Sequence, residues 1–253
     1  MLLHYSVKGE GPPLILIHGL FGMGENLSMI ARALQGSFTI YSVDLRNHGR
    51  SFHADTMSLQ EMADDVSQLM DELSLDTGVV LGHSLGGKVA MQLALQEPQR
   101  VKRLIVADIA PVLYGGHHDG VLAGLNAVTP TNINSRGEAD TILKKYIEDA
   151  GVRMFLLKSL YRDEAGEFNW RLNVSALETC YDDIRQGNTG DQYHAPCLFI
   201  KGENSAYIQE KHRDTINAFF PQASIEMIHN AGHWLHAEQP EAFINVVKRF
   251  LML

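Results

Sequence analysis

The feature that most constrains the fold lies at residues 78–96, where a short apolar run is joined to a helical pattern by a glycine-rich turn. The run at 78–81 is apolar throughout, which is typical of a strand buried on both faces of a parallel sheet. Residues 88–96 have a helical pattern that stops before Pro98. A strand followed directly by a helix predicts one β–α unit of a parallel sheet.

The same alternation recurs near both ends of the chain. Further apolar runs of strand length lie at 14–17, 39–43, 104–107, 196–200 and 224–228. Residues 57–73 have apolar side chains at helical spacing, and Ser58 with Glu61 fits a capping box at its start. Another helix is expected at 241–251, after Pro240. These elements predict an α/β fold with a doubly wound, mostly parallel sheet.

The pattern changes after Pro111. From about 112 to 191 no strand run is apparent, and amphipathic helices are expected around 121–128, 139–150, 152–160 and 174–185. We therefore predict an α/β core made of residues 1–111 and 191–253. Residues 112–190 are predicted to form an inserted helical cap, which would exclude water from a site at the sheet edge.

The turn after the 78–81 run matches the pattern G-x-S-x-G, written here as Gly82-His83-Ser84-Leu85-Gly86. Its position between a strand and a helix makes the match specific. Such a sharp turn holds its central residue in a strained backbone conformation, and the flanking glycines leave room for it. The turn would lift the hydroxyl of Ser84 above the sheet edge, so Ser84 is predicted to be a nucleophile.

Four stretches resemble the α/β-hydrolase superfamily: 18–22, 44–51, 82–87 and 231–234. More narrowly, the chain is similar to the small bacterial esterases of the YbfF type. This closer resemblance rests on 44–51, 108–111 and 232–238. It implies hydrolysis of carboxylic esters, extending to acyl thioesters, without fixing the natural substrate.

A serine hydroxyl needs a base to remove its proton. His233 lies between the last predicted strand and the last helix, at the sheet edge that also carries the serine turn. We predict that His233 is this base. The neighbouring His229 and His236 are expected to be exposed or structural, and no metal site is predicted.

The acid that orients the base has two candidates. Many relatives carry an aspartate at the position of Asn204, and a neutral amide cannot stabilise an imidazolium as a carboxylate does. Glu203 stands beside it. Asp108 lies at the end of the 104–107 run. In the esterases that the chain most resembles, the acid stands at this position. Asp108 is the predicted acid, with Glu203 as the alternative.

Acyl transfer also needs hydrogen-bond donors for the tetrahedral oxyanion. The backbone N–H groups of Leu20 and Leu85 are predicted to supply them. Phe21 is a predicted substrate-binding residue because its loop borders the site. Ser205 is a second predicted substrate-binding residue. Its hydroxyl could also form a hydrogen bond within the triad as an accessory group.

Composition limits the partners. The chain has 21 basic and 30 acidic residues and a net charge of −9, which disfavours binding to nucleic acid or anionic lipid. Its two cysteines have no metal-type spacing. No signal peptide or membrane span is evident, so the expected location is cytoplasmic. The oligomeric state is left open.

Together these features predict a cofactor-free serine esterase that acts on small to medium carboxylic esters, and on thioesters, through an acyl-enzyme. The same triad could instead serve a dedicated thioesterase, a carbon–carbon hydrolase or a lyase. A non-catalytic ligand-binding protein on a hydrolase scaffold is the alternative outside the enzymes. It predicts no adduct at Ser84 and no turnover of any ester.

Overall fold

The computed structural model describes residues 1–253, except for the side chain of Pro130. Its main sheet has seven strands in the order β1-β3-β2-β4-β5-β8-β9. Their bounds are β1 (Tyr5–Lys8), β2 (Pro13–Ile17), β3 (Thr39–Val43), β4 (Gly78–His83), β5 (Val101–Ala107), β8 (Cys197–Gly202) and β9 (Ala223–Ile228). Neighbouring strands are parallel, except that β1 pairs antiparallel with β3. The predicted α/β fold with a mostly parallel sheet is confirmed.

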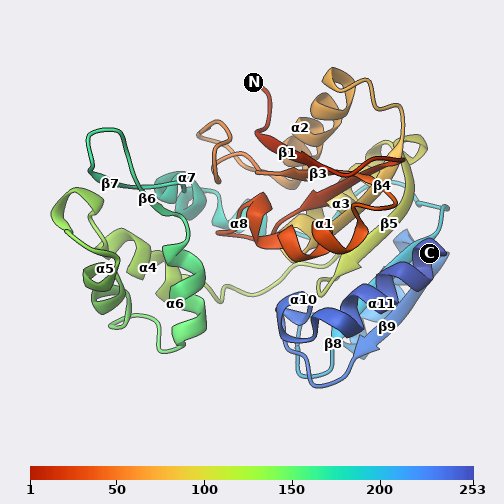
Figure 1. Ribbon diagram of the computed structural model, residues 1–253. Coiled ribbons are helices and arrows are strands. Elements are labelled where there is room, and N and C mark those ends of the chain that lie inside the picture. Colours follow the sequence, from red (N-terminus) through yellow and green to blue (C-terminus); the bar gives the residue numbers. More distant parts are fainter.

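Helices cover both faces of this sheet (Figure 1). On one face, α1 (Ser28–Leu34) and α11 (Pro240–Leu251) pack on a core that includes Leu81 and Ile105. On the other, α2 (Leu59–Glu72), α3 (Leu85–Gln96) and α9 (Arg213–Phe219) pack on a second core. Burial of both faces explains why the central strands are apolar along their whole length.

The capping box of α2 is present as predicted. The Ser58 hydroxyl accepts from Glu61 N at 3.2 Å, and the Glu61 carboxylate accepts from Ser58 N at 2.8 Å. Short 3₁₀ helices occur elsewhere in the chain, at Gly24–Leu27, Pro98–Arg100, Pro130–Asn132 and Glu210–His212. A four-residue helix, α10 (Leu235–Glu238), precedes α11.

The chain between β5 and β8 lies beyond one end of the sheet, to the left in Figure 1. It contains α4 (Asp119–Ala127), α5 (Arg136–Leu143), α6 (Ala150–Leu157), β6 (Leu160–Arg162), β7 (Phe168–Trp170), α7 (Val174–Thr179) and α8 (Tyr181–Ile184). The expectation of no strand here was wrong, because β6 and β7 form an antiparallel hairpin. The helix expected at 139–150 was also wrong in extent, since α5 ends at Leu143.

Lys88 of α3 forms hydrogen bonds with both ends of the segment between β5 and β8. Its ammonium donates to the carbonyls of Val112, at 2.8 Å, and Arg185, at 3.0 Å, and also to Gln186 O. The side chain is buried, which lowers the Lys88 pKa to about 7. Three carbonyl acceptors match the three donors of an ammonium, so the buried group is well satisfied.

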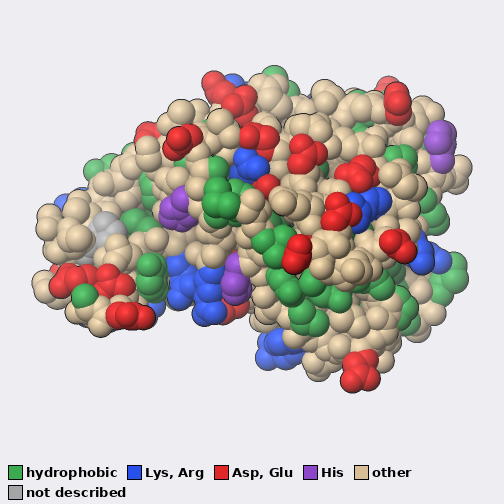
Figure 2. All heavy atoms as spheres, turned by 90° about the horizontal axis from the view of Figure 1, so that it is seen from above, with side chains coloured by type: hydrophobic (Ala, Val, Ile, Leu, Met, Phe, Trp, Pro, Cys, Tyr) green, Lys and Arg blue, Asp and Glu red, His purple; other side chains and the backbone are tan. Residues whose placement is uncertain are grey.

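Among the described residues, no helix has the length and apolar character needed to cross a bilayer. Acidic side chains are spread over the face seen in Figure 2, with basic side chains between them.

Candidate active site

The turn at Ser84 has the predicted geometry. β4 ends at His83 and α3 begins at Leu85, so the helix starts three residues before the helical pattern at 88–96. Between them Ser84 has φ 54° and ψ −120°, a strained conformation for a residue with a side chain. A Cβ atom on Gly82 would lie 2.0 Å from Gly86 O, and one on Gly86 would lie 2.2 Å from Ile17 O. The turn therefore requires glycine on both sides of the serine.

Ser84, His233 and Asp108 form one hydrogen-bonded chain. His233 Nδ1 lies 2.7 Å from Asp108 Oδ2, and His233 Nε2 lies 3.0 Å from Ser84 Oγ. An ionised carboxylate only accepts, so Nδ1 carries the proton and donates to it. Nε2 is then free to accept the serine proton, which is the tautomer that general-base activation requires.

Asp108 follows β5 directly and is fully buried. Its φ of 53° turns the chain out of the strand. The carboxylate accepts from Gly202 N at 3.1 Å and from the Ser205 hydroxyl, in addition to the His233 imidazole. These donors offset the cost of removing the charge from water.

The structure brings Asp108, and not Glu203, to the histidine. Glu203 accepts instead from Asn230 N, at 2.8 Å, and faces the exposed His229 at 3.3 Å. The hydrogen bond from Asn230 N, with that from His229, lowers the Glu203 pKa. Glu203 therefore stabilises the loop after β9 and does not orient His233.

Two buried histidines support the backbone around His233. His83 Nε2 lies 2.8 Å from the His233 carbonyl and so donates to it. His236 packs edge-on against His83, with ring centroids 4.5 Å apart. Burial lowers the pKa of His83 well below its usual value and that of His236 to about 4. Both rings are therefore neutral at pH 7.

The two predicted oxyanion donors lie on either side of Ser84. Leu85 is the first residue of α3, where a backbone N–H has no partner inside the helix. Leu20 lies in the loop after β2, next to Gly19, whose position for a Cβ is 3.2 Å from Ser84 Cβ. Within the described part of the chain, neither N–H has a protein acceptor. Both are free to bind a ligand oxygen.

Two cavities meet at Ser84. The larger, of about 310 Å³, is lined by both Phe21 and His233. The smaller, of about 50 Å³, is lined mainly by apolar groups. Shared by both are Leu20, Ser84, His117, His118 and Tyr207. Phe21 thus borders the site as predicted, whereas Ser205 contacts Asp108 and is not among the described lining residues of either cavity.

Several lining residues were missed by sequence reasoning. His117 and His118 match no motif in the sequence, but His118 packs edge-on against Phe21, with ring centroids 5.7 Å apart. Tyr207 lies on the His233 ring, and Tyr181 contacts His118 Nδ1 at 2.6 Å. No local motif marks these residues. Their aromatic character, in segments without a regular apolar period, was the only available signal.

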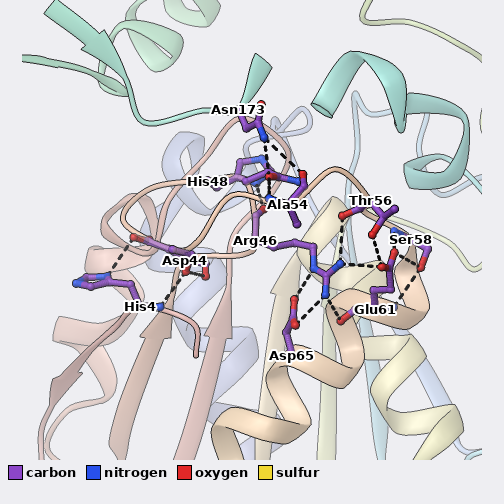
Figure 3. A network of polar contacts seen from close by, with 12 residues as sticks. His4, Asp44, Arg46, His48, Ala54, Thr56, Ser58, Glu61, Asp65 and Asn173 are labelled. Carbon is purple, nitrogen blue, oxygen red and sulfur yellow. Dashed lines mark hydrogen bonds and ion pairs between the residues drawn. The ribbon is translucent and has the colours of Figure 1, made fainter. Parts of the chain in front are cut away.

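The loop after β3 is fixed by charged residues (Figure 3). Asp44 accepts from Gly24 N at 2.7 Å and from Arg50 N at 2.9 Å. Arg46 forms a two-bond ion pair with Asp65, at 2.6 and 2.9 Å. These contacts hold the loop in place.

Among the described residues, no group of three or more histidine, cysteine, aspartate or glutamate side chains is placed to hold a metal ion.

Comparisons with known proteins agree with this geometry. A family model described as the alpha/beta hydrolase fold matches residues 12–123. The chain is 39% identical to "Esterase YbfF" of Escherichia coli (strain K12), over 94% of this chain and 92% of that protein. It is also 39% identical to "sn-1-specific diacylglycerol lipase ABHD11" of Mus musculus, over 95% and 81% of the two chains. A solved structure, "Marine microorganism esterase", superimposes with a TM-score of 0.96 at 42% identity, covering 98% and 99% of the two chains.

Proposed function

The chain belongs to the α/β-hydrolase family, and from this premise we propose that it is a serine esterase that hydrolyses small to medium carboxylic esters. The observation that carries the proposal is the chain of contacts from Ser84 through His233 to Asp108, at 3.0 and 2.7 Å. The names of the similar proteins, esterase and lipase, support ester hydrolysis.

The proposed reaction proceeds through an acyl-enzyme. Ser84 Oγ attacks the ester carbonyl carbon while His233 Nε2 takes the hydroxyl proton. The carbonyl oxygen becomes an oxyanion and accepts from the N–H groups of Leu20 and Leu85. His233 then returns the proton to the departing alcohol. A water molecule repeats these steps on the acyl-serine and releases the acid.

We assign the two sides of the ester to the two cavities from the position of the base. His233 must give its proton to the leaving oxygen, and His233 lines only the larger cavity. The alcohol side therefore occupies this cavity of about 310 Å³, and the acyl chain occupies the smaller one, beside Leu85 and Ile184. The small size of the second cavity, about 50 Å³, favours short acyl chains.

Residues 112–190 are proposed to form a cap over this site. The support is that α6 and α8 contribute lining residues, among them Phe155, Leu156 and Ile184. Leu122, Leu125 and Trp170 of the same segment are absent from the described walls of both cavities; Leu122 and Leu125 are buried. A cap of this kind would exclude water and select substrates by size.

Thioesters are a second class of acyl donor for the same triad, since their chemistry differs only in the leaving atom. The carbon–carbon hydrolase, lyase and ligand-binding alternatives have no specific observation in their favour. The cytoplasmic location stays a prediction.

The proposal is tested by hydrolysis of p-nitrophenyl esters from acetate to long-chain esters, by wild type and Ser84→Ala. We expect wild-type turnover with an optimum at short chains. Ser84→Ala should reduce kcat by about 10⁶-fold, because the nucleophile is lost. Circular dichroism should show that the variant is folded. Wild-type inactivity on every ester, with or without thioester activity, would contradict the esterase assignment.

A further inference from the structure

The geometry of residues 18–22, the loop after β2 that carries the proposed oxyanion donor Leu20 N–H, depends on a residue outside the triad. The proposed donor, Leu20 N–H, shares a peptide group with the Gly19 carbonyl. That carbonyl accepts from His18 Nδ1 at 2.8 Å and from Gly22 N at 3.0 Å. In a planar trans peptide the C=O and N–H point in opposite directions. Fixing the Gly19 oxygen therefore aims the Leu20 N–H.

The next residue of the loop is held by His48. Phe21 has φ 62°, a left-handed conformation that is costly for a bulky side chain. Its N–H donates to His48 Nε2 at 3.1 Å. His48 Nδ1 lies 2.9 Å from the Arg46 carbonyl, which can only accept, so Nδ1 carries the proton and Nε2 is the acceptor. Each ring nitrogen of this fully buried histidine thus has one defined partner.

His48 is itself braced by the segment between β5 and β8 (Figure 3). His48 pairs with Leu172 in an isolated antiparallel bridge. Asn173 N donates to the Asn47 carbonyl at 3.0 Å, and Asn173 Nδ2 lies 3.1 Å from Asn47 Oδ1. Asn47 has φ 63°, so these contacts fix a strained residue directly beside His48.

We propose that His48 is a positioning residue for the oxyanion donor, and that Asn173 extends its hold into the proposed cap. In this arrangement His48 fixes the left-handed turn at Phe21, and that turn sets the direction of the Leu20 N–H. A displacement of residues 172–173 would therefore alter the direction of the Leu20 N–H, which faces the charge that develops in the transition state. This inference rests on the proposed esterase function.

Burial of the His48 ring, with the positive charge of nearby histidines, lowers its pKa to about 3. The ring therefore stays neutral across the working pH range. Protonation would place a hydrogen on Nε2 and remove the acceptor for Phe21 N–H.

The test compares His48→Ala, His48→Gln and the loop control His53→Gln, which changes an exposed histidine five residues away. The readouts are kcat and KM on p-nitrophenyl butanoate and the Ki of an aryl trifluoromethyl ketone, whose serine adduct carries an oxyanion. We expect His48→Ala to lower kcat and weaken ketone binding by about 10²-fold each, with little change in KM. His48→Gln should recover part of the loss, because its amide oxygen can accept from Phe21 N–H.

Asn173→Ala tests the contacts between Asn173 and Asn47 and leaves the His48 side chain beside Phe21 in place. Asn134→Ala is the control in the same segment. Asn173→Ala should show a smaller loss of the same type, in kcat and Ki together, and Asn134→Ala should match wild type. The proposal is overturned if KM rises while kcat and Ki stay unchanged, or if neither His48→Ala nor His48→Gln changes kcat. It is also overturned if the loss of kcat equals the fraction of molecules that fail active-site titration.

Amide hydrogen exchange at Phe21 separates this proposal from the esterase proposal. Wild type should protect the Phe21 amide, and His48→Ala should lose that protection, whether or not any ester is hydrolysed. Protection that is unchanged in His48→Ala would overturn the positioning role. Inactive wild-type protein with the expected exchange pattern would overturn only the esterase assignment.

Discussion

The ring of Tyr207 stacks on the imidazole of His233, with centroids 4.0 Å apart and planes inclined by 21°. The Tyr207 carbonyl accepts from the Tyr114 hydroxyl, and Tyr207 N donates to Ser205 Oγ at 3.2 Å, so the backbone that carries the ring is fixed at both its N–H and its carbonyl. The His233 imidazole is therefore positioned by stacking on the Tyr207 ring as well as by hydrogen bonds to Asp108 and Ser84.

Tyr207→Ala should lower kcat by about three- to tenfold, because stacked rings contribute about 0.5–1.5 kcal/mol beyond their buried area. Tyr207→Phe keeps the ring and should stay near wild type. Steady-state kinetics on one short-chain ester would check both. Equal losses in the two variants would mean that the hydroxyl, rather than the stacked ring, matters.

Asp108→Asn should lower kcat by about 10⁴-fold, since an amide in place of the carboxylate favours the wrong histidine tautomer. Glu203→Gln is the matched control on the neighbouring loop and should retain nearly all activity. The measurement is kcat for both variants at pH 7.5. The reverse pattern would place the acid after β8 and contradict the geometry at His233.

Ile184→Ala should shift the acyl preference toward longer chains. Ile184 is buried on α8 and lines only the smaller cavity. We expect kcat/KM on hexanoate relative to butanoate to rise by about tenfold, the size of a methylene effect in an apolar pocket. Phe155→Ala, in the larger cavity alone, should alter the preference among alcohols and leave the acyl optimum in place. A shifted acyl optimum in Phe155→Ala instead would reverse the assignment of the cavities.

His236→Phe should reduce the acid sensitivity of folding. The His236 pKa is about 4 in the folded state and near 6.5 when the chain is unfolded, so the unfolded state binds more protons between these values. Its contribution to stability is present above pH 6.5 and is lost as the pH falls to about 4. Between pH 7 and pH 4.5, the free energy of unfolding of wild type should then drop by about 2.4 kcal/mol more than that of His236→Phe. Urea denaturation at pH 7 and pH 4.5 measures the difference; parallel curves would contradict it.

The sequence predicted those parts of the fold that carry a clear period. The β strands at the centre of the sheet are buried on both faces and read as unbroken apolar runs. β1 (Tyr5–Lys8) was missed because it is a largely exposed edge strand, and β6 and β7 were missed because three residues are too few to show a pattern.

The candidate site follows the same rule. Ser84 could be predicted because the turn constrains its neighbours to glycine. Asp108 and His233 could be predicted from their places at strand ends, with the help of a family resemblance. Tyr207 and His48 could not, because their roles depend on contacts between distant segments that leave no local signature.

Covalent labelling of wild type with a fluorophosphonate, followed by peptide mass spectrometry, tests the central claim most directly. The account predicts a single adduct, on the peptide that contains Ser84, and much slower labelling in His233→Gln, because the base is then missing. Unlabelled wild-type protein, or an adduct on a different residue, would contradict the assignment of Ser84 as the nucleophile.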